Sequence, residues 1–279
     1  MKNILKIMLM MITIFTIAGS AVYAAEIPVS DQDQLITSND WTEISNLQDE
    51  MKKEEPDATI DYDKALKVYV DCNLIKLQTA DTKKLTSALE SANYVWVIPF
   101  KMEKTYGMFT VAKGLPLREE AKSVLTKAEQ EEVKNHAGKW MITEIAEHTV
   151  EPYYDILLEK REALSDCTRV VLVGSQPGMR QPVALGMDDE TARIWISLGY
   201  QYPVMEKIPE TQNVESGVYS FDSVAEISDT YIEDSEVSTG VGVQSRSSMK
   251  YVAGIGIIVI GSILIFSVLK KKKLEQSGE

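Results

Sequence analysis

The sequence predicts an α+β (mixed α/β) ectodomain at residues 64–208 together with one C-terminal transmembrane helix. Three observations support this fold class. Apolar runs typical of strands alternate with segments of helical spacing throughout residues 64–208. Acidic residues concentrate on both sides of that region. An uncharged run of nineteen residues stands before four consecutive lysines near the end of the 279-residue chain. A region of the size of residues 64–208 is typical of one domain with its own core.

The N-terminus, residues 1–24, has the pattern of a secretory signal peptide. Lys2 and Lys6 precede a short apolar stretch, and Val22 and Ala24 belong to a small-residue cleavage site. An uncleaved anchor is the alternative, although the apolar stretch is short for a membrane span. Under both interpretations the following residues lie outside the cytoplasm.

Residues 25–63 form an acidic segment with one predicted amphipathic helix. Positions 26–63 hold twelve acidic residues against two lysines, a net charge of −10. Like charges keep such a segment soluble and extended. The helix is predicted to follow Asp40, which forms a capping pair with Glu43. Its apolar residues fall near one face at helical spacing: Trp41, Ile44, Leu47 and Met51.

The first half of the ectodomain, residues 64–138, predicts a strand, a helix and a hairpin. Alternation along 66–72 is typical of a half-buried strand. The apolar face of that strand holds Leu66, Val68, Val70 and Cys72. The elements that follow are a helix at 81–92, a buried strand at 94–100 that folds back into 108–113, and a helix at 116–135.

The second half, residues 139–208, runs through a similar order. An offset of 75 residues places the hairpin strands of one half on those of the other. Two interpretations stay open: two similar strand–helix–hairpin units, either fused about a pseudo-twofold axis or joined in one sheet, or an α+β chain without a repeat. The predicted elements are a strand at 139–148, a helix at 150–164, strands at 169–174 and 182–187, and a last strand at 192–198.

The C-terminal part predicts a stalk, a membrane span and a short tail. Residues 209–249 hold eight acidic residues against one arginine and read as a flexible acidic stalk. Residues 250–269 are long enough to cross a bilayer as a helix. The lysines that follow place the tail, residues 270–279, in the cytoplasm. The sequence thus predicts a single-pass type I protein of the cell membrane with an extracytoplasmic N-terminal domain.

Within the predicted span, Gly254 and Gly261 are seven residues apart and share a helix face. Such a face lets a second transmembrane helix approach closely. The alternative is a simple anchor that tolerates glycine.

The division of charge argues against nucleic acid as a partner. Residues 64–208 hold twenty acidic and nineteen basic residues, so the folded region is almost neutral. No basic stripe is present to neutralise phosphates. The spacing of histidine, cysteine and acidic residues matches no metal-binding motif, and we expect neither a metal site nor a cofactor.

Cys72 and Cys167 are the only cysteines. In an oxidising compartment they could form a disulfide, while the alternative for Cys72 is packing as a small hydrophobic residue. A nucleophilic cysteine would need one of the two histidines, His136 and His148, and no local catalytic signature surrounds either thiol.

The densest aromatic stretch holds Trp195, Tyr200 and Tyr202. We expect these side chains to form a binding surface for a partner or a ligand, with core packing as the alternative for Trp195. Tyr200 and Tyr202 follow Gly199 and are the better surface candidates.

These observations predict a membrane-anchored, extracytoplasmic binding or interaction protein of the cell envelope. It would be an accessory subunit of a membrane complex, with the bilayer and another membrane protein as partners. Two alternatives stay open. One is a ligand-sensing ectodomain that acts through a membrane partner, and the other is a cell-envelope enzyme with a Cys/His pair. The sequence favours a protein without enzymatic activity because no catalytic motif is evident.

Overall fold

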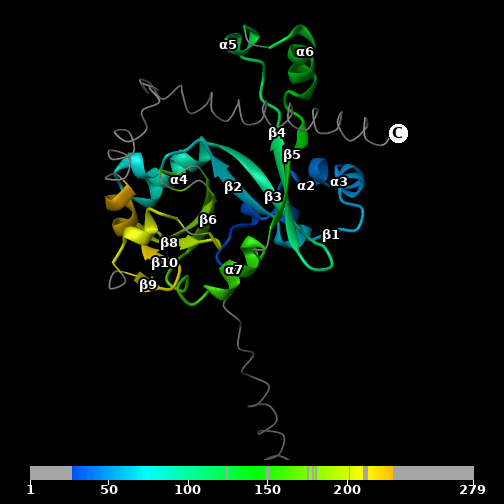
Figure 1. Cartoon of the computed structure of the whole chain (residues 1–279). Coiled ribbons are helices and arrows are strands. Elements are labelled where there is room, and N and C mark those ends of the chain that lie inside the picture. The colour runs from blue at the N-terminus through cyan, green and yellow to red at the C-terminus, as the bar shows by residue number, and fades with distance from the viewer. Residues whose placement is uncertain are drawn as a thin grey trace, which may run out of the picture.

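A computed structural model describes residues 27–123, 125–148, 151–174, 176–177, 179, 181–200, 202–209 and 213–228. These residues form one ten-stranded sheet, whose main path has the order β5-β4-β3-β2-β6-β7-β8-β10-β9. Helices and irregular segments cover both faces of the sheet (Figure 1). The strands are β1 (Thr59–Ile60), β2 (Leu66–Val70), β3 (Asn93–Lys101), β4 (Tyr106–Lys113), β5 (Trp140–His148), β6 (Arg169–Val173), β7 (Val183–Met187), β8 (Ala192–Ser197), β9 (Asn213–Glu215) and β10 (Val218–Ser220).

The helices lie between and before these strands. The α-helices are α2 (Trp41–Ser45), α3 (Gln48–Glu54), α4 (Thr82–Glu90), α5 (Glu119–Lys122), α6 (Lys127–His136) and α7 (Tyr153–Glu159). The short 3-10 helices are η1 (Asp31–Asp33), η2 (Leu35–Thr37), η3 (Tyr62–Lys64), η4 (Ile75–Leu77) and η5 (Met205–Lys207). Residues 221–228 are helical as well.

Strand β2 stands at the centre of the sheet. It pairs in antiparallel fashion with β3 and in parallel with β6. The meander β3-β4-β5 extends the sheet on one side, and β6-β7-β8 extends it on the other. The chain passes from the edge strand β5 to β6, on the other side of β2, through the segment that holds α7.

Both faces of β2 are buried, which corrects the prediction of a half-buried strand. Leu66 and Val68 belong to the core cluster on the α7 face. Lys67 and Tyr69 are also buried, on the opposite face. Elements covering both faces of the central strands explain this pattern, since a strand inside a two-sided sheet has no solvent face.

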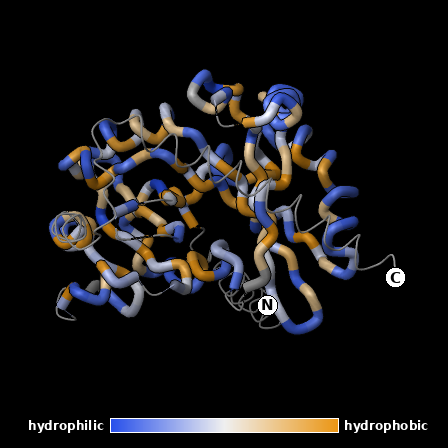
Figure 2. The backbone as a smooth tube through the Cα atoms, turned by 45° about the horizontal axis from the view of Figure 1, so that its top comes forward, coloured by the Kyte–Doolittle hydropathy of each residue, from blue (hydrophilic) through white to orange (hydrophobic). Residues whose placement is uncertain are grey.

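The core has three parts. The cluster on the α7 face is one of them. The other two lie on the opposite face: one includes α4, η5 and helix 221–228, and the other includes α2, α3 and the aromatic residues of β3 and β4. The tube of α6, by contrast, is largely hydrophilic in Figure 2, and no side chain of α6 is buried.

The N-terminal segment 27–37 threads through the sheet between the first residues of β2 and β6. Val29 bridges Val170 of β6, whereas Gln34 bridges Leu66 of β2. The two strands pair directly only further along, at Val68–Leu172 and Tyr69–Val173. Ile27 and Val29 therefore lie in the core on the α7 face, and Leu35 lies in the core on the opposite face.

The folded region is larger than the predicted residues 64–208. Part of the acidic N-terminal segment lies in the core, because Ile44 and Met51 are fully buried. Residues 213–220, assigned from the sequence to the stalk, add the hairpin β9-β10 to the sheet beside β8. Phe221 and Val224 of the following helix are buried as well.

The two strand–helix–hairpin units predicted from the sequence are not equivalent. The first strand of the proposed second unit, β5, pairs with β4 of the first unit along its whole length. Strand β5 therefore extends the hairpin β3–β4 of the first unit. In the first unit, by contrast, β2 pairs directly with its own hairpin through β3. The residues between Lys113 and Trp140, which form α5 and α6, separate β4 from β5 in the sequence and hide this pairing.

The helix predicted at 116–135 is two helices, α5 and α6. Thr126 interrupts it, because its hydroxyl accepts a hydrogen bond from the N–H of Glu129 and the Glu129 carboxylate accepts one from the N–H of Thr126. This capping box starts a new helix within the predicted one.

The predicted fold class included a transmembrane helix, and this part is corrected. Among the described residues, no helix is long and apolar enough to cross a lipid bilayer. For this part of the chain the fold is mixed α+β with one large sheet, and the single-pass transmembrane prediction is corrected with it. The segments of the predicted signal peptide, span and tail, with Gly254 and Gly261, lie outside the described residues.

Candidate functional site

The aromatic residues predicted to bind a partner lie largely in the core. Trp195 is fully buried and stacks on Phe221, with ring centroids 5.6 Å apart. Tyr202 is buried and its hydroxyl donates a hydrogen bond of 2.5 Å to the Pro182 carbonyl. Tyr200 is half-buried and packs against core clusters on both faces of the sheet. Trp195 and Tyr202 therefore stabilise the fold and present no binding surface.

Both cysteines are free thiols, so of the two alternatives that the sequence left open the disulfide is not formed. Cys167 lies in the core on the α7 face, whereas Cys72 packs against the cluster on the opposite face. Asp71 explains this separation: its φ of 55° breaks the alternation of β2 before Cys72. A regular strand would have put Cys72 on the same face as Val68 and Val70.

The environment of the thiols does not activate them as nucleophiles. Burial, followed by the charge of Asp71, raises the pKa of Cys72 to about 12. Burial also raises the pKa of Cys167 to about 11, with Asp188 as the next cause. The thiolate is the nucleophilic form, and a raised pKa removes it at neutral pH. His136 lies in the last turn of α6, and His148 ends β5.

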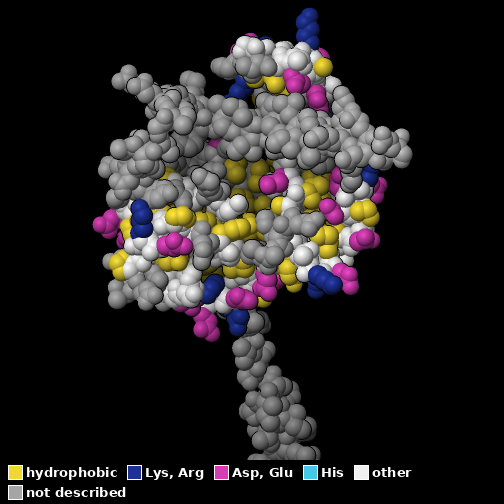
Figure 3. All heavy atoms as spheres, in the orientation of Figure 1, with side chains coloured by type: hydrophobic (Ala, Val, Ile, Leu, Met, Phe, Trp, Pro, Cys, Tyr) yellow, Lys and Arg dark blue, Asp and Glu magenta, His cyan; other side chains and the backbone are white. Residues whose placement is uncertain are grey.

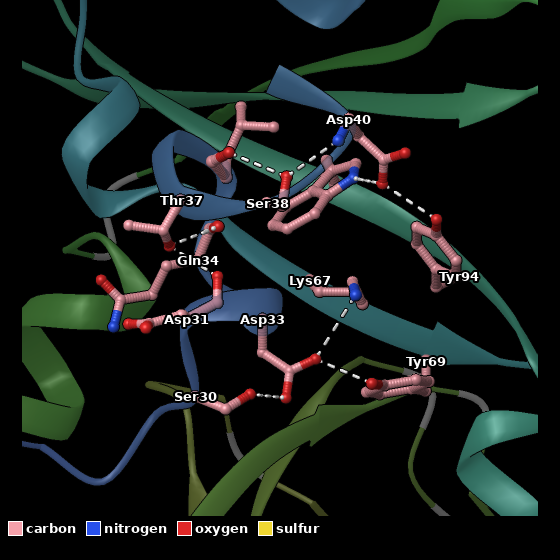
Figure 4. Close-up of polar contacts among 12 residues, drawn as sticks. Ser30, Asp31, Asp33, Gln34, Thr37, Ser38, Asp40, Lys67, Tyr69 and Tyr94 are labelled. Carbon is pink, nitrogen blue, oxygen red and sulfur yellow. Dashed lines mark hydrogen bonds and ion pairs between the residues drawn. The ribbon is translucent and has the colours of Figure 1, made fainter. Parts of the chain in front are cut away.

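A buried ionic cluster lies where the N-terminal segment crosses the sheet (Figure 4). Asp33 is 2% exposed. Its carboxylate accepts hydrogen bonds from the hydroxyls of Ser30 at 2.6 Å and Tyr69 at 2.7 Å. Two cations of the sheet reach it as well: Arg169 Nη2 lies 3.1 Å and Lys67 Nζ 3.6 Å from the carboxylate oxygens.

Aromatic rings enclose the ammonium group of Lys67. Its Nζ lies 4.6 Å from the centroid of the Tyr94 ring and 5.2 Å from that of Trp96. These distances allow cation–π attraction. The hydroxyl of Tyr94 and the indole N–H of Trp96 donate hydrogen bonds of 2.9 and 3.0 Å to Asp40. The N-terminal segment thus contributes two carboxylates: Asp33 faces two cations of the sheet, and Asp40 accepts hydrogen bonds from two aromatic residues of β3.

This cluster stabilises the packing of the N-terminal segment on the sheet, and it is not accessible to a ligand. The carboxylate of Asp33 and the ammonium of Lys67 are both buried. Their mutual neutralisation and hydrogen bonds offset the desolvation of the charges. None of the described depressions is lined by Asp33, Lys67 or Arg169.

An open depression of about 390 Å³ lies outside this cluster, beside α2 and β1. Trp41 and Tyr62 meet edge to face in its wall, with centroids 5.2 Å apart and planes at 71°. The hydroxyl of Tyr62 donates to the sulfur of Met51 at 3.7 Å and thus points into the core. Ile36, which is 38% exposed, adds an apolar side chain to the wall.

Carboxylates line the same depression. Asp61 and Asp63 lie on either side of Tyr62, and Lys101 is the one cation of the lining. Within the described ranges, no group of three or more His, Cys, Asp or Glu side chains is placed to hold a metal ion. The surface therefore joins aromatic, apolar and acidic groups, and it suits recognition of a ligand better than metal binding.

A second depression of about 290 Å³ lies at the carboxyl end of β2. Cys72 lines it together with Leu74 and Ala88. Leu77, 44% exposed, stands in its wall. None of the residues that line it is aromatic. The thiol of Cys72 is protonated at neutral pH because its pKa is raised.

Sequence reasoning missed the depression of Trp41 and Tyr62 because it treated the acidic N-terminal segment as solvated. One signal was present: Trp41 and Tyr62 are large aromatic residues inside a segment otherwise dominated by acidic and polar residues. Comparison with protein-family models, curated proteins and solved structures found no match for this chain.

Proposed function

We propose that this chain is a binding or interaction protein that recognises its partner through the depression of Trp41 and Tyr62. The aromatic wall of that depression carries the proposal, because Trp41 and Tyr62 are only half-buried. Trp and Tyr side chains dominate the binding energy of many interfaces because they bury a large area at low entropic cost. Here the two rings stand next to an exposed isoleucine and two carboxylates.

The fold supports this proposal by holding the depression rigidly. Ile44 of α2 and Met51 of α3 are fully buried beneath it. Asp40, the residue before Trp41, is hydrogen-bonded to Tyr94 and Trp96 of the sheet. A preformed surface loses little conformational entropy on binding. The predicted action of the protein outside the cytoplasm stays a prediction.

Photo-crosslinking of the full-length chain in the cells that produce it tests the proposal. A photoreactive amino acid replaces Ile36 in one variant and Leu77 in another. Both side chains are exposed, at 38% and 44%, and they line different depressions. We expect a discrete adduct from position 36 that disappears when Trp41→Ala is added.

The outcome at position 77 makes the test specific. An adduct from position 77 alone would move recognition to the second depression and overturn the proposal. Equal labelling from both positions, or labelling at position 36 that Trp41→Ala leaves unchanged, would also contradict it. A Trp41→Phe variant keeps an aromatic wall and should retain the adduct.

A further inference from the structure

We infer that the depression of Trp41 and Tyr62 binds a cationic side chain, the guanidinium or ammonium of an extended polypeptide partner. This inference rests on the proposed function and adds the chemistry of the partner. Three observations support the inference: the angle between the two rings, the charge of the lining and the free edge of β1.

The angle between the rings favours a cation over a sugar. The planes of Trp41 and Tyr62 meet at 71°, so the two rings form adjacent walls of a corner. A sugar ring stacks best when one of its C–H faces lies on a single aromatic plane. A corner of two rings can instead surround a compact cation, which is attracted to the electron-rich face of an aromatic ring.

The charge of the lining also favours a cation. Asp63 is exposed and has no ion-pair or hydrogen-bond partner among the described residues. Asp61 lies 3.7 Å from Lys64, but the ammonium of Lys64 makes a closer contact of 2.8 Å with Asp155. A bound cation would therefore complement carboxylates that the protein leaves largely uncompensated.

The one cation of the lining does not cancel this charge. The ammonium of Lys101 lies 5.7 Å from the centroid of the Tyr106 ring, within the range of a cation–π contact. Lys101 forms no salt bridge with Asp61 or Asp63 among the described residues. Two carboxylates against one ammonium leave the lining with a net negative charge.

The edge of β1 indicates a polypeptide as the source of the cation. Thr59 and Ile60 line the depression and pair with β3 on one side. No second strand is paired with β1 in the described part of the chain. An extended peptide could pair along such an edge and place alternate side chains against the wall. The exposed Ile36 would contact an apolar residue of the same peptide.

Fluorescence polarisation with the full-length protein tests this inference. The probe is a fluorescein-labelled peptide of alternating leucine and arginine, and matched peptides carry glutamine or glutamate in place of arginine. We expect the arginine peptide to bind at least ~10-fold more tightly than the glutamine peptide, since a buried or half-buried charge pair strengthens binding. The glutamate peptide should not bind.

Matched variants locate the binding. Asp63→Asn removes the exposed carboxylate of the depression without disturbing a packed residue, and it should weaken the arginine peptide about 5-fold and reduce its salt dependence. Asp57→Asn, an exposed carboxylate of the same acidic segment outside the lining, is the control and should change nothing. Trp41→Phe should bind better than Trp41→Leu.

The outcomes separate this inference from the proposed function. Equal affinity for arginine and glutamine peptides, or choline chloride binding as tightly as the peptide, would overturn the inference. Binding of a xylan or cellulose oligosaccharide that Asp63→Asn leaves unchanged would replace it with a sugar site. If the position 36 adduct forms while the arginine peptide fails to bind, the proposed function stands and only the cationic partner is rejected.

Discussion

Asp33 shows how one buried charge holds the N-terminal segment 27–37, which has little secondary structure of its own, on the sheet. Its carboxylate joins η1 to β2 through Tyr69 and Lys67 and to β6 through Arg169. Residues 69 and 169 are far from residue 33 in the sequence. A local pattern therefore cannot predict this contact, and the sequence presented Asp33 as one of many acids in a soluble flank.

We predict that Asp33→Ala destabilises the protein by about 3–5 kcal/mol. The substitution leaves the buried ammonium of Lys67 and the half-buried guanidinium of Arg169 without their carboxylate, and an uncompensated buried charge is costly. Urea unfolding of the full-length chain at pH 7 measures the effect. Asp31→Ala is the control, because Asp31 lies exposed in the same short helix and should cost less than about 0.5 kcal/mol. Equal effects of both substitutions would contradict the prediction.

Asp40 illustrates a prediction that was right in position and wrong in mechanism. The predicted amphipathic helix begins after Asp40, but it is two helices, because α2 ends at Ser45 and α3 begins at Gln48. The Asp40 side chain makes no capping hydrogen bond and is bonded to Tyr94 and Trp96. The competing partners lie on β3, so tertiary contacts replaced the local capping pair with Glu43.

At the scale of elements, capped helices differ in how they are coupled to the core. Asp81 caps α4 by accepting from the N–H groups of Lys83 and Lys84 at 2.9 and 3.2 Å, and this helix buries Leu85 and Leu89. Thr126 caps α6 with a complete capping box, yet α6 buries no side chain. The two caps have similar chemistry and different surroundings.

We predict that Thr126→Ala and Asp81→Ala separate local from global stability. Each substitution removes a cap worth about 1 kcal/mol. Asp81→Ala should lower the free energy of global unfolding, because α4 unfolds together with the core. Thr126→Ala should instead speed hydrogen exchange in α6 alone. Urea unfolding and hydrogen exchange by mass spectrometry measure the two effects. A global loss from Thr126→Ala would show that α6 is part of the cooperative core.

The sequence predicted elements well where the pattern was local. The strands β2, β3 and β4 and the helix α4 lie close to the predicted ranges, because alternation, apolar runs and the cap at Asp81 are local signals. The helices α5 and α6 were joined by mistake because Thr126 was not recognised as a cap. The short strands β9 and β10 lie in a segment whose composition is typical of a stalk, and pairing with β8 stabilises them.

At the scale of the whole molecule, pairing between distant strands decided what the sequence could not predict. The parallel pair β2-β6 joins residues about one hundred positions apart, and β5 pairs across the α5-α6 insertion. Both pairings depend on which faces of the strands become buried when the chain folds. The proposed recognition surface depends on the same packing. On the side where α2, α3 and β1 lie in Figure 1, hydrophobic side chains stand beside Asp and Glu side chains in Figure 3.

The buried titratable groups predict loss of stability in alkali. Burial raises the pKa values of Cys72 to about 12 and of Cys167 to about 11. It also raises the pKa values of Tyr69, Tyr94, Tyr153 and Tyr202 above that of free tyrosine. The folded protein thus holds these protons at a pH at which the unfolded chain has lost them. Stability is fully present below the unfolded pKa and falls as the pH rises toward the folded value.

We therefore expect the free energy of unfolding to be constant near neutral pH and to fall above a pH of about 9. The thiols act first, since an unfolded cysteine ionises near pH ~8.5, and the tyrosines follow above pH ~10. The buried thiol of Cys167 alone should contribute a slope of up to about 1.4 kcal/mol per pH unit in this window.

Urea unfolding between pH 7 and pH 11 measures the curve. A variant with Cys72→Ala and Cys167→Ala is the control, and it should delay the loss until the tyrosines ionise. A flat curve to pH ~10.5 in the unmodified protein would contradict this prediction, because it would mean that the thiols lose their protons equally in the folded and unfolded chains. Packing of the two thiols against separate core clusters argues for unequal loss.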